Sequence, residues 1–106
     1  MLYHTVSVRR DNHTVHSTSV APWEVPILEF IFEDGNVEAT GERVKADRDY
    51  PDAGSEMDRL IRAYGADRQS GVPYAASVYG QARAGIKALQ KRIDEAKAED
   101  EEGILN

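Results

Sequence analysis

The stretch from Trp23 to Phe32, Trp-Glu-Val-Pro-Ile-Leu-Glu-Phe-Ile-Phe, constrains the fold more than any other part of the chain. It contains the only tryptophan and both phenylalanines. Large aromatic side chains dominate the apolar surface that a small domain can bury. The hydrophobic core therefore has to form around this stretch.

Two structures are compatible with this stretch, a helix and a strand. Helical spacing places Trp23, Ile27 and Ile31 on one face, whereas the alternation of a strand fails at the two glutamates and the proline. Pro22 suits a first helical turn, and Gly35 suits the position just past a helix end. A helix is therefore predicted. The alternative is a strand over residues 27–32 that turns at Asp34-Gly35.

The N-terminal part of the sequence predicts a β-hairpin. Residues 3–9 and 14–20 are rich in threonine, valine and serine, which suit strands. Asp11 and Asn12 are the predicted loop residues, because both types tolerate turn conformations. This loop would place Val8 opposite Val15. A further strand is predicted over 37–45, with a bulge at Gly41.

The second half of the sequence predicts helices. Asp52 or Ser55 can cap a helix that Gly65 ends. Its apolar residues recur at helical spacing, namely Met57, Leu60, Ile61 and Tyr64. Pro73 can begin a short helical piece over residues 74–79. The last helix carries an apolar stripe formed by Ala82, Ile86, Leu89, Ile93 and Ala96.

The order of these elements predicts an α+β fold, in which a small antiparallel sheet packs against two or three helices, the longest of them C-terminal. A chain of 106 residues is expected to form one domain. We place this domain at residues 1–98 and an acidic C-terminal tail at 99–106. Anions at a helix C-terminus oppose the macrodipole, so the tail is expected to fray unless a partner holds it.

Composition excludes several classes of chemistry. The chain has no cysteine, which excludes disulfides, thiolate catalysis and cysteine-bound metal centres. It shows neither a signal peptide nor a stretch that could span a bilayer, so a soluble, intracellular protein is expected. The net charge of −6 is distributed as +2 over residues 1–10, −8 over residues 11–67, +4 over residues 68–98 and −4 over residues 99–106. Nucleic acid is therefore not predicted as a partner.

Two clusters invite a metal hypothesis, and spacing argues against both. In the predicted hairpin, His4 and His13 share a face about 20 Å apart, and His16 lies on the other face. The acidic run formed by Asp47, Asp49, Asp52 and Glu56 places Pro51 and Asp52 where a calcium loop needs a ligand and a glycine. No metal and no cofactor are predicted.

Other candidate residues have ordinary structural explanations. Arg83, Lys87 and Lys91 recur at helical spacing, as in the solvated face of an amphipathic helix. Tyr64, Tyr74 and Tyr79 suit core or interface packing. We find no nucleophile elbow and no phosphate-binding glycine loop. The sequence therefore predicts no enzyme.

Four short runs resemble small uncharacterised proteins of tailed bacteriophages: Pro22-Trp23-Glu24-Val25-Pro26, Tyr64-Gly65, Gly71-Val72-Pro73-Tyr74 and Val78-Tyr79-Gly80. The resemblance covers the middle and end of the chain and carries over no catalytic or binding residue. It implies a virion or assembly component, located in the virion or in the host cytoplasm.

The sequence thus predicts a structural or assembly protein that acts through protein–protein contacts, within an oligomer or larger assembly. The alternative is a regulatory protein whose acidic segment occupies a basic surface on a host protein. We predict seven contact residues: Trp23, Tyr74, Tyr79, Glu99, Asp100, Glu101 and Glu102.

Overall fold

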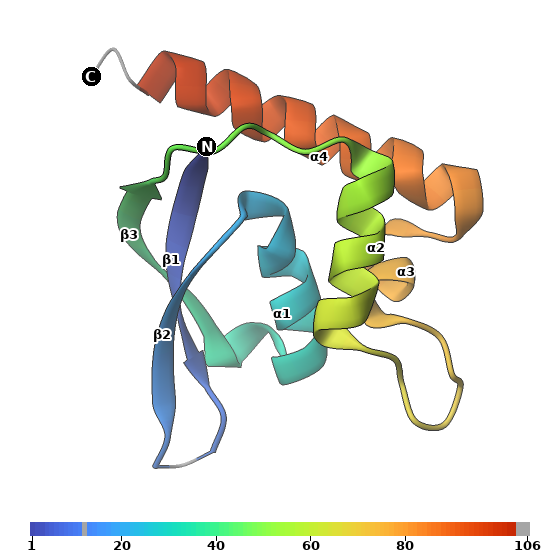
Figure 1. The fold of residues 1–106 in the computed structure, drawn as a ribbon. Coiled ribbons are helices and arrows are strands. Elements are labelled where there is room, and N and C mark those ends of the chain that lie inside the picture. Colours follow the sequence, from blue (N-terminus) through green and yellow to red (C-terminus); the bar gives the residue numbers. More distant parts are fainter. Residues whose placement is uncertain (12, 104–106) are drawn as a thin grey trace. The chain divides into compact units, whose positions relative to one another are not determined.

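A computed structural model describes residues 1–11 and 13–103 of the chain, and the side-chain environment of every described residue except Gly103 (Figure 1). The chain divides into two compact units, Met1–Asp49 and Tyr50–Asn106. We call them the sheet unit and the helical unit and describe each separately. The predicted α+β class is confirmed, with an antiparallel sheet and the longest helix at the C-terminal end.

The sheet unit contains three antiparallel strands in the order β2-β1-β3. They are β1 (Leu2–Arg9), β2 (Val15–Val20) and β3 (Val37–Lys45), and they confirm the predicted hairpin and third strand. β1 is the central strand, and it pairs with β2 over six consecutive residues without a shift in register. The sheet therefore depends on β1 for all of its pairing.

The predicted register of the hairpin is wrong by one residue. Val8 lies opposite His16, not Val15. The N–H of Arg10 donates to the carbonyl of Thr14 at 3.0 Å, so the loop is longer than the predicted Asp11-Asn12 pair. The Asp11 carboxylate accepts hydrogen bonds from the N–H groups of the two residues before β2, His13 and Thr14, at 2.8 Å each. Asn12 lies outside the described residues.

The predicted bulge is confirmed. The pairing of β1 with β3 shifts between His4 and Val6, opposite the segment that contains Gly41. Gly41 has φ of +85°, a conformation that glycine adopts without steric cost. The hydroxyl of Thr40 donates to the carbonyl of Thr5 at 3.1 Å, which ties the bulged segment to the central strand.

The stretch from Trp23 to Phe32 is helical, so the alternative strand is wrong. A 3-10 turn, η1 (Pro22–Glu24), leads into α1 (Val25–Phe32). Pro26 lies in the first turn of α1, where a missing N–H removes no intrahelical bond. The buried Glu24 carboxylate accepts a hydrogen bond from the N–H of Ala21 at 2.8 Å.

The core of the sheet unit joins α1 to one face of the sheet. α1 contacts β1 and β3 (Figure 1). Trp23 is 1% exposed and Ile27 is fully buried. The sheet contributes buried valines from all three strands: Val6, Val8, Val20 and Val37. Burying each large side chain contributes about 1.5–3 kcal/mol, so these residues supply most of the driving force for this unit.

The end of α1 differs from the expectation. Glu33, not Gly35, takes the positive φ of 72° just past the helix. Gly35 lies in a second 3-10 turn, η2 (Asp34–Asn36). The side chain of Asn36 donates to the carbonyl of Phe32 at 2.8 Å and satisfies one of the last carbonyls of the helix.

The helical unit contains α2 (Ala53–Tyr64), α3 (Tyr74–Tyr79) and α4 (Ala82–Gly103), each of which confirms a predicted helix. Of the two predicted caps, Asp52 caps α2, and Gly65 ends the helix as predicted. The three helices contact one another. Their buried apolar side chains include Met57, Leu60, Ala75, Leu89, Ile93 and Ala96.

The acidic residues 99–102 continue α4. Asp100 is buried, and the hydroxyl of Tyr50 donates to its carboxylate at 2.9 Å. The contact ties the last turns of α4 to the segment before α2. Residues 104–106 of the predicted tail lie outside the described residues, and the division at residue 98 stays a prediction.

The close approach of two glycines joins the end of α3 to the start of α4. A β-carbon on Gly85 would lie 2.7 Å from the carbonyl carbon of Gly80 and 3.3 Å from the Met57 side chain. Real β-carbons do not approach another atom as closely as the first of these separations. The atom in the way belongs to the backbone, so it cannot move aside as the end of a flexible side chain could. A glycine is therefore required within α4.

We predict that Gly85→Ala destabilises the helical unit by about 1–3 kcal/mol through overpacking. In an unconstrained helix the same change would stabilise by about 1 kcal/mol, so the sign is diagnostic. Urea unfolding followed by circular dichroism at the helical minimum measures the difference. Gly35→Ala is the control, since a β-carbon there would meet nothing within 4 Å. A neutral or stabilising Gly85→Ala would contradict the prediction.

Candidate functional site

The three histidines are not brought together. His4 lies opposite Val20 and His16 lies opposite Val8, so both project from the same face of the sheet, which corrects the prediction that His16 lies on the other face. Four residues of strand separate them, a distance of about 13 Å. His13 is exposed in the hairpin loop. Within residues 1–11 and 13–103, no group of three potential metal ligands is assembled.

The acidic residues around α2 act on their own backbone and neighbours. The Asp52 carboxylate accepts from the N–H of Ser55 at 2.9 Å and from its hydroxyl at 3.0 Å. Glu56 is 3% exposed, and the guanidinium of Arg59 donates to both of its oxygens at 2.8 and 2.7 Å. Asp47 and Asp49 are exposed. The carboxylates of Asp52 and Glu56 therefore already have hydrogen-bond partners within the protein.

Three aspartates form the same kind of capping hydrogen bond. Asp11, Asp52 and Asp67 each accept hydrogen bonds from backbone N–H groups at the start of a turn or helix. Those hydrogen bonds favour the ionised form and lower the pKa of each carboxyl. The perturbed pKa values therefore have a structural cause and indicate no catalytic acid or base.

Glu29 titrates differently. Burial raises the pKa of the Glu29 carboxyl, and the hydrogen bond and negative charge of Asp34 raise it further. A pair of carboxyl groups can serve general acid–base chemistry when both face a cleft. Neither residue lines any of the hollows described below.

The seven predicted contact residues occupy different environments. Trp23 is a core residue that presents almost no surface. Tyr74 and Tyr79 lie at the two ends of α3 and are half-buried. In the last turns of α4, Asp100 is buried and its three acidic neighbours, Glu99, Glu101 and Glu102, are exposed. A contact role stays a prediction for all seven. Sequence reasoning missed Tyr50, whose partner Asp100 is distant in the sequence.

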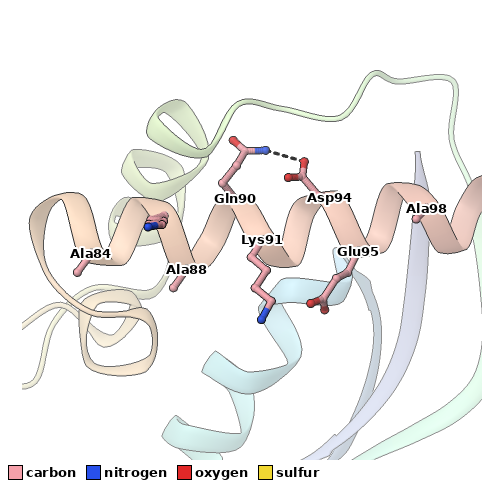
Figure 2. A pocket seen from close by; sticks show the side chains of 8 residues that line it. Ala84, Ala88, Gln90, Lys91, Asp94, Glu95 and Ala98 are labelled. Carbon is pink, nitrogen blue, oxygen red and sulfur yellow. Dashed lines mark hydrogen bonds between the residues drawn. The ribbon is translucent and has the colours of Figure 1, made fainter.

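A broad surface hollow of about 850 Å³ runs along α4 (Figure 2). Its floor carries Ala84, Ala88 and Ala98, with Lys91 and Glu95 between them. The predicted basic stripe falls partly on this face, because Lys87 also lines it. Every lining residue comes from the one helix, so the hollow is a shallow helix face that encloses nothing.

A second hollow, of about 470 Å³, lies on the sheet unit and is polar. It is lined by Ser7, Arg9, Val15, Gly35, Asn36 and Glu38. Arg9 and Glu38 bring opposite charges to it, so it favours neither anions nor cations strongly.

A third hollow, of about 460 Å³, lies in the helical unit, and we call it the apolar groove. It is lined by Met57, Ile61, Gly71, Val72, Pro73, Ala76, Gly80, Gln81, Ala82 and Ile86. Five segments build it: α2, the loop before α3, α3 itself, the Gly80-Gln81 connection and the start of α4. The lining includes no ionisable side chain, and Gln81 supplies its one polar side chain.

Backbone hydrogen bonds set the position of the loop that forms one wall of the groove. The N–H of Asp67 donates to the carbonyl of Val72 at 3.0 Å, and the N–H of Gly71 donates to the carbonyl of Asp67 at 2.8 Å. Gly71 has φ of +73°. This turn holds Val72 and Pro73 beside α3. Ile86, near the start of α4, also lines the groove and is 40% exposed.

No protein-family model, curated protein or solved structure matches the chain. None of the helices formed by residues 1–11 and 13–103 has the length and hydropathy that a bilayer crossing requires.

We predict that Asp52 stabilises α2 only while it is ionised. Its pKa is lowered in the folded state, so its contribution is present above the unfolded pKa and is lost as pH falls through the lowered folded pKa. The wild type should be more stable than Asp52→Asn at neutral pH, and the gap should close in acid. Urea unfolding from pH 7 to pH 2 measures the gap. A gap that does not change with pH would contradict the prediction.

Proposed function

We propose that this chain is a non-enzymatic structural or assembly protein that binds another protein through the apolar groove. The observation that carries the proposal is the lining of the groove, which leaves Ile86 partly exposed among apolar walls. Covering apolar surface contributes about 25 cal/mol per Å² removed from water. A partner that inserts apolar side chains would therefore gain affinity from this groove.

The composition of the groove favours a protein partner over a small metabolite. Sites for small molecules combine an apolar lining with a few convergent polar groups that fix the orientation of the ligand. Here Gln81 is the polar side chain of the lining. Protein interfaces instead have an apolar core surrounded by a polar rim, and they need no convergent groups at the centre.

The lining of the apolar groove also argues against catalysis there. General acid–base and nucleophilic mechanisms need a titratable or nucleophilic side chain within reach of the substrate. The groove lining offers none. The resemblance to bacteriophage proteins suggests the setting, an assembly within a virion or in the host cytoplasm.

The competing proposal is a regulatory protein that uses its acidic surface. It draws on the net charge of −8 over residues 11–67. Some of that charge is already engaged, since Glu56 is paired with Arg59 and Asp11, Asp52 and Asp67 accept backbone hydrogen bonds. Binding through the remaining charge would weaken as salt is added, whereas binding in the apolar groove would not.

The test is a selection of peptides from a random library on the immobilised full chain. We expect enriched peptides with apolar anchors, bound equally by wild type and Val44→Asp and about tenfold more weakly by Ile86→Asp. Val44 is the matched control, because it is 39% exposed, compared with 40% for Ile86, and lies in the sheet unit. Fluorescence polarisation at low and high salt measures the affinities.

Three outcomes would overturn the proposal. The library could yield no enriched sequence. The selected peptides could bind Ile86→Asp as tightly as wild type, which would place them elsewhere. They could be basic and lose affinity with added salt, which would favour the acidic regulatory protein.

A further inference from the structure

The two edges of the sheet differ in how they are protected. β2 and β3 each pair with β1 and with no other described strand. An exposed edge offers free N–H and C=O groups to a further strand, and proteins block such edges with bulges and charges. β3 has both devices: the bulge at Gly41, and four charged side chains, Glu38, Glu42, Arg43 and Lys45.

β2 has neither device. Its sequence, Val-His-Ser-Thr-Ser-Val, contains no aspartate, glutamate, lysine, arginine, proline or glycine. It is regular, because its six pairs with β1 follow one another without a shift. Val15, His16, Ser17 and Ser19 are exposed, and Val15 is 57% exposed. A regular, neutral edge of this kind is ready to accept another strand.

The ladder with β1 shows which backbone groups of β2 are free to do so. In an antiparallel pair, hydrogen-bonded and non-hydrogen-bonded positions alternate. Arg10 and Thr14 form a hydrogen-bonded position, so the even-numbered residues of β2 face β1. The hydroxyls of Thr5 and Ser19 lie 3.0 Å apart, as expected for the closer, non-hydrogen-bonded position. The N–H and C=O groups of Val15, Ser17 and Ser19 therefore point away from β1.

We propose that β2 pairs antiparallel with β2 of a second copy of this chain, about a two-fold axis at Ser17. In this register Ser17 faces Ser17 of the second copy, and Val15 faces Ser19. Each facing pair exchanges two backbone hydrogen bonds, which satisfies every outward group of the strand. The result is one continuous sheet through both copies.

Three features favour a second copy as the occupant. The outward positions Val15, Ser17 and Ser19 are complementary to themselves in this register. Residues that face each other share a side of the sheet, so the buried valines of both copies stay on one side. The strand carries no formal charge, so the pairing brings no like charges into contact within the strand itself.

The protected edge limits the assembly to two copies. Each copy has one free regular edge, and the two-fold axis uses both of them. β3 is bulged and charged, so it would not extend the sheet further. A two-fold contact of this kind closes on itself and does not grow into a fibre.

The absence of cysteine makes the register directly testable. At Ser17 the two Cα atoms would lie about 5.5 Å apart, inside the range of roughly 4.4–6.8 Å that a disulfide requires. The two Ser19 positions would lie about 13 Å apart. Under mild oxidation of the full chain, Ser17→Cys should form covalent dimers and Ser19→Cys should not, as measured on a non-reducing gel.

A charge exchange provides an independent measurement. Ser17→Lys and Ser17→Glu should each be monomeric by light scattering, and their equimolar mixture should restore the dimer. Ser7→Lys is the matched control, since Ser7 lies opposite Ser17 on the central strand, where a charge should leave the wild-type dimer intact.

A monomeric wild type, equal cross-linking at both cysteine positions, or mixed variants that stay monomeric would overturn the pairing. The apolar groove is not involved, so its proposal would stand if the pairing failed.

Discussion

The register of β2 on β1 is the constraint on which the rest of the sheet unit depends. The hydrogen bonds from the N–H groups of His13 and Thr14 to the Asp11 carboxylate support it just before β2 begins. That register places Val6, Val8 and Val20 on one side, where α1 covers the sheet. It also fixes which backbone groups of β2 point outward. One register thus determines both the valine face of the core and the outward backbone groups of the free edge.

Local patterns in the sequence were sufficient for most elements. The stripe from Met57 to Tyr64 predicted α2, with a cap at Asp52 or Ser55 and an end at Gly65. Gly41 predicted the bulge, because a positive φ was needed there. The helical face of Trp23 and Ile27 predicted α1 correctly against the strand alternative. Each of these features is decided by residues within a few positions of one another.

Features that combine distant residues could not be predicted. The hairpin register depended on whether the loop had one more residue, which composition alone does not decide. The hydrogen bond between Tyr50 and Asp100 joins residues that no periodicity relates. The apolar groove draws its walls from five segments, and in the sequence its residues belong to separate helices and loops. The sequence also suggested Trp23 as a contact residue, because sequence alone does not distinguish an aromatic side chain in the core from one at an interface.

The contact between Gly80 and Gly85 has a consequence for tracing the ancestry of the chain. Gly80 has φ of +110°, and Gly85 has no room for a β-carbon, so replacing either glycine by another residue would strain the fold. Surface residues around them are free to change. Two glycines five positions apart at the start of a long helix would therefore outlast most of the surrounding sequence, and they offer a marker for distant relatives that overall identity would miss.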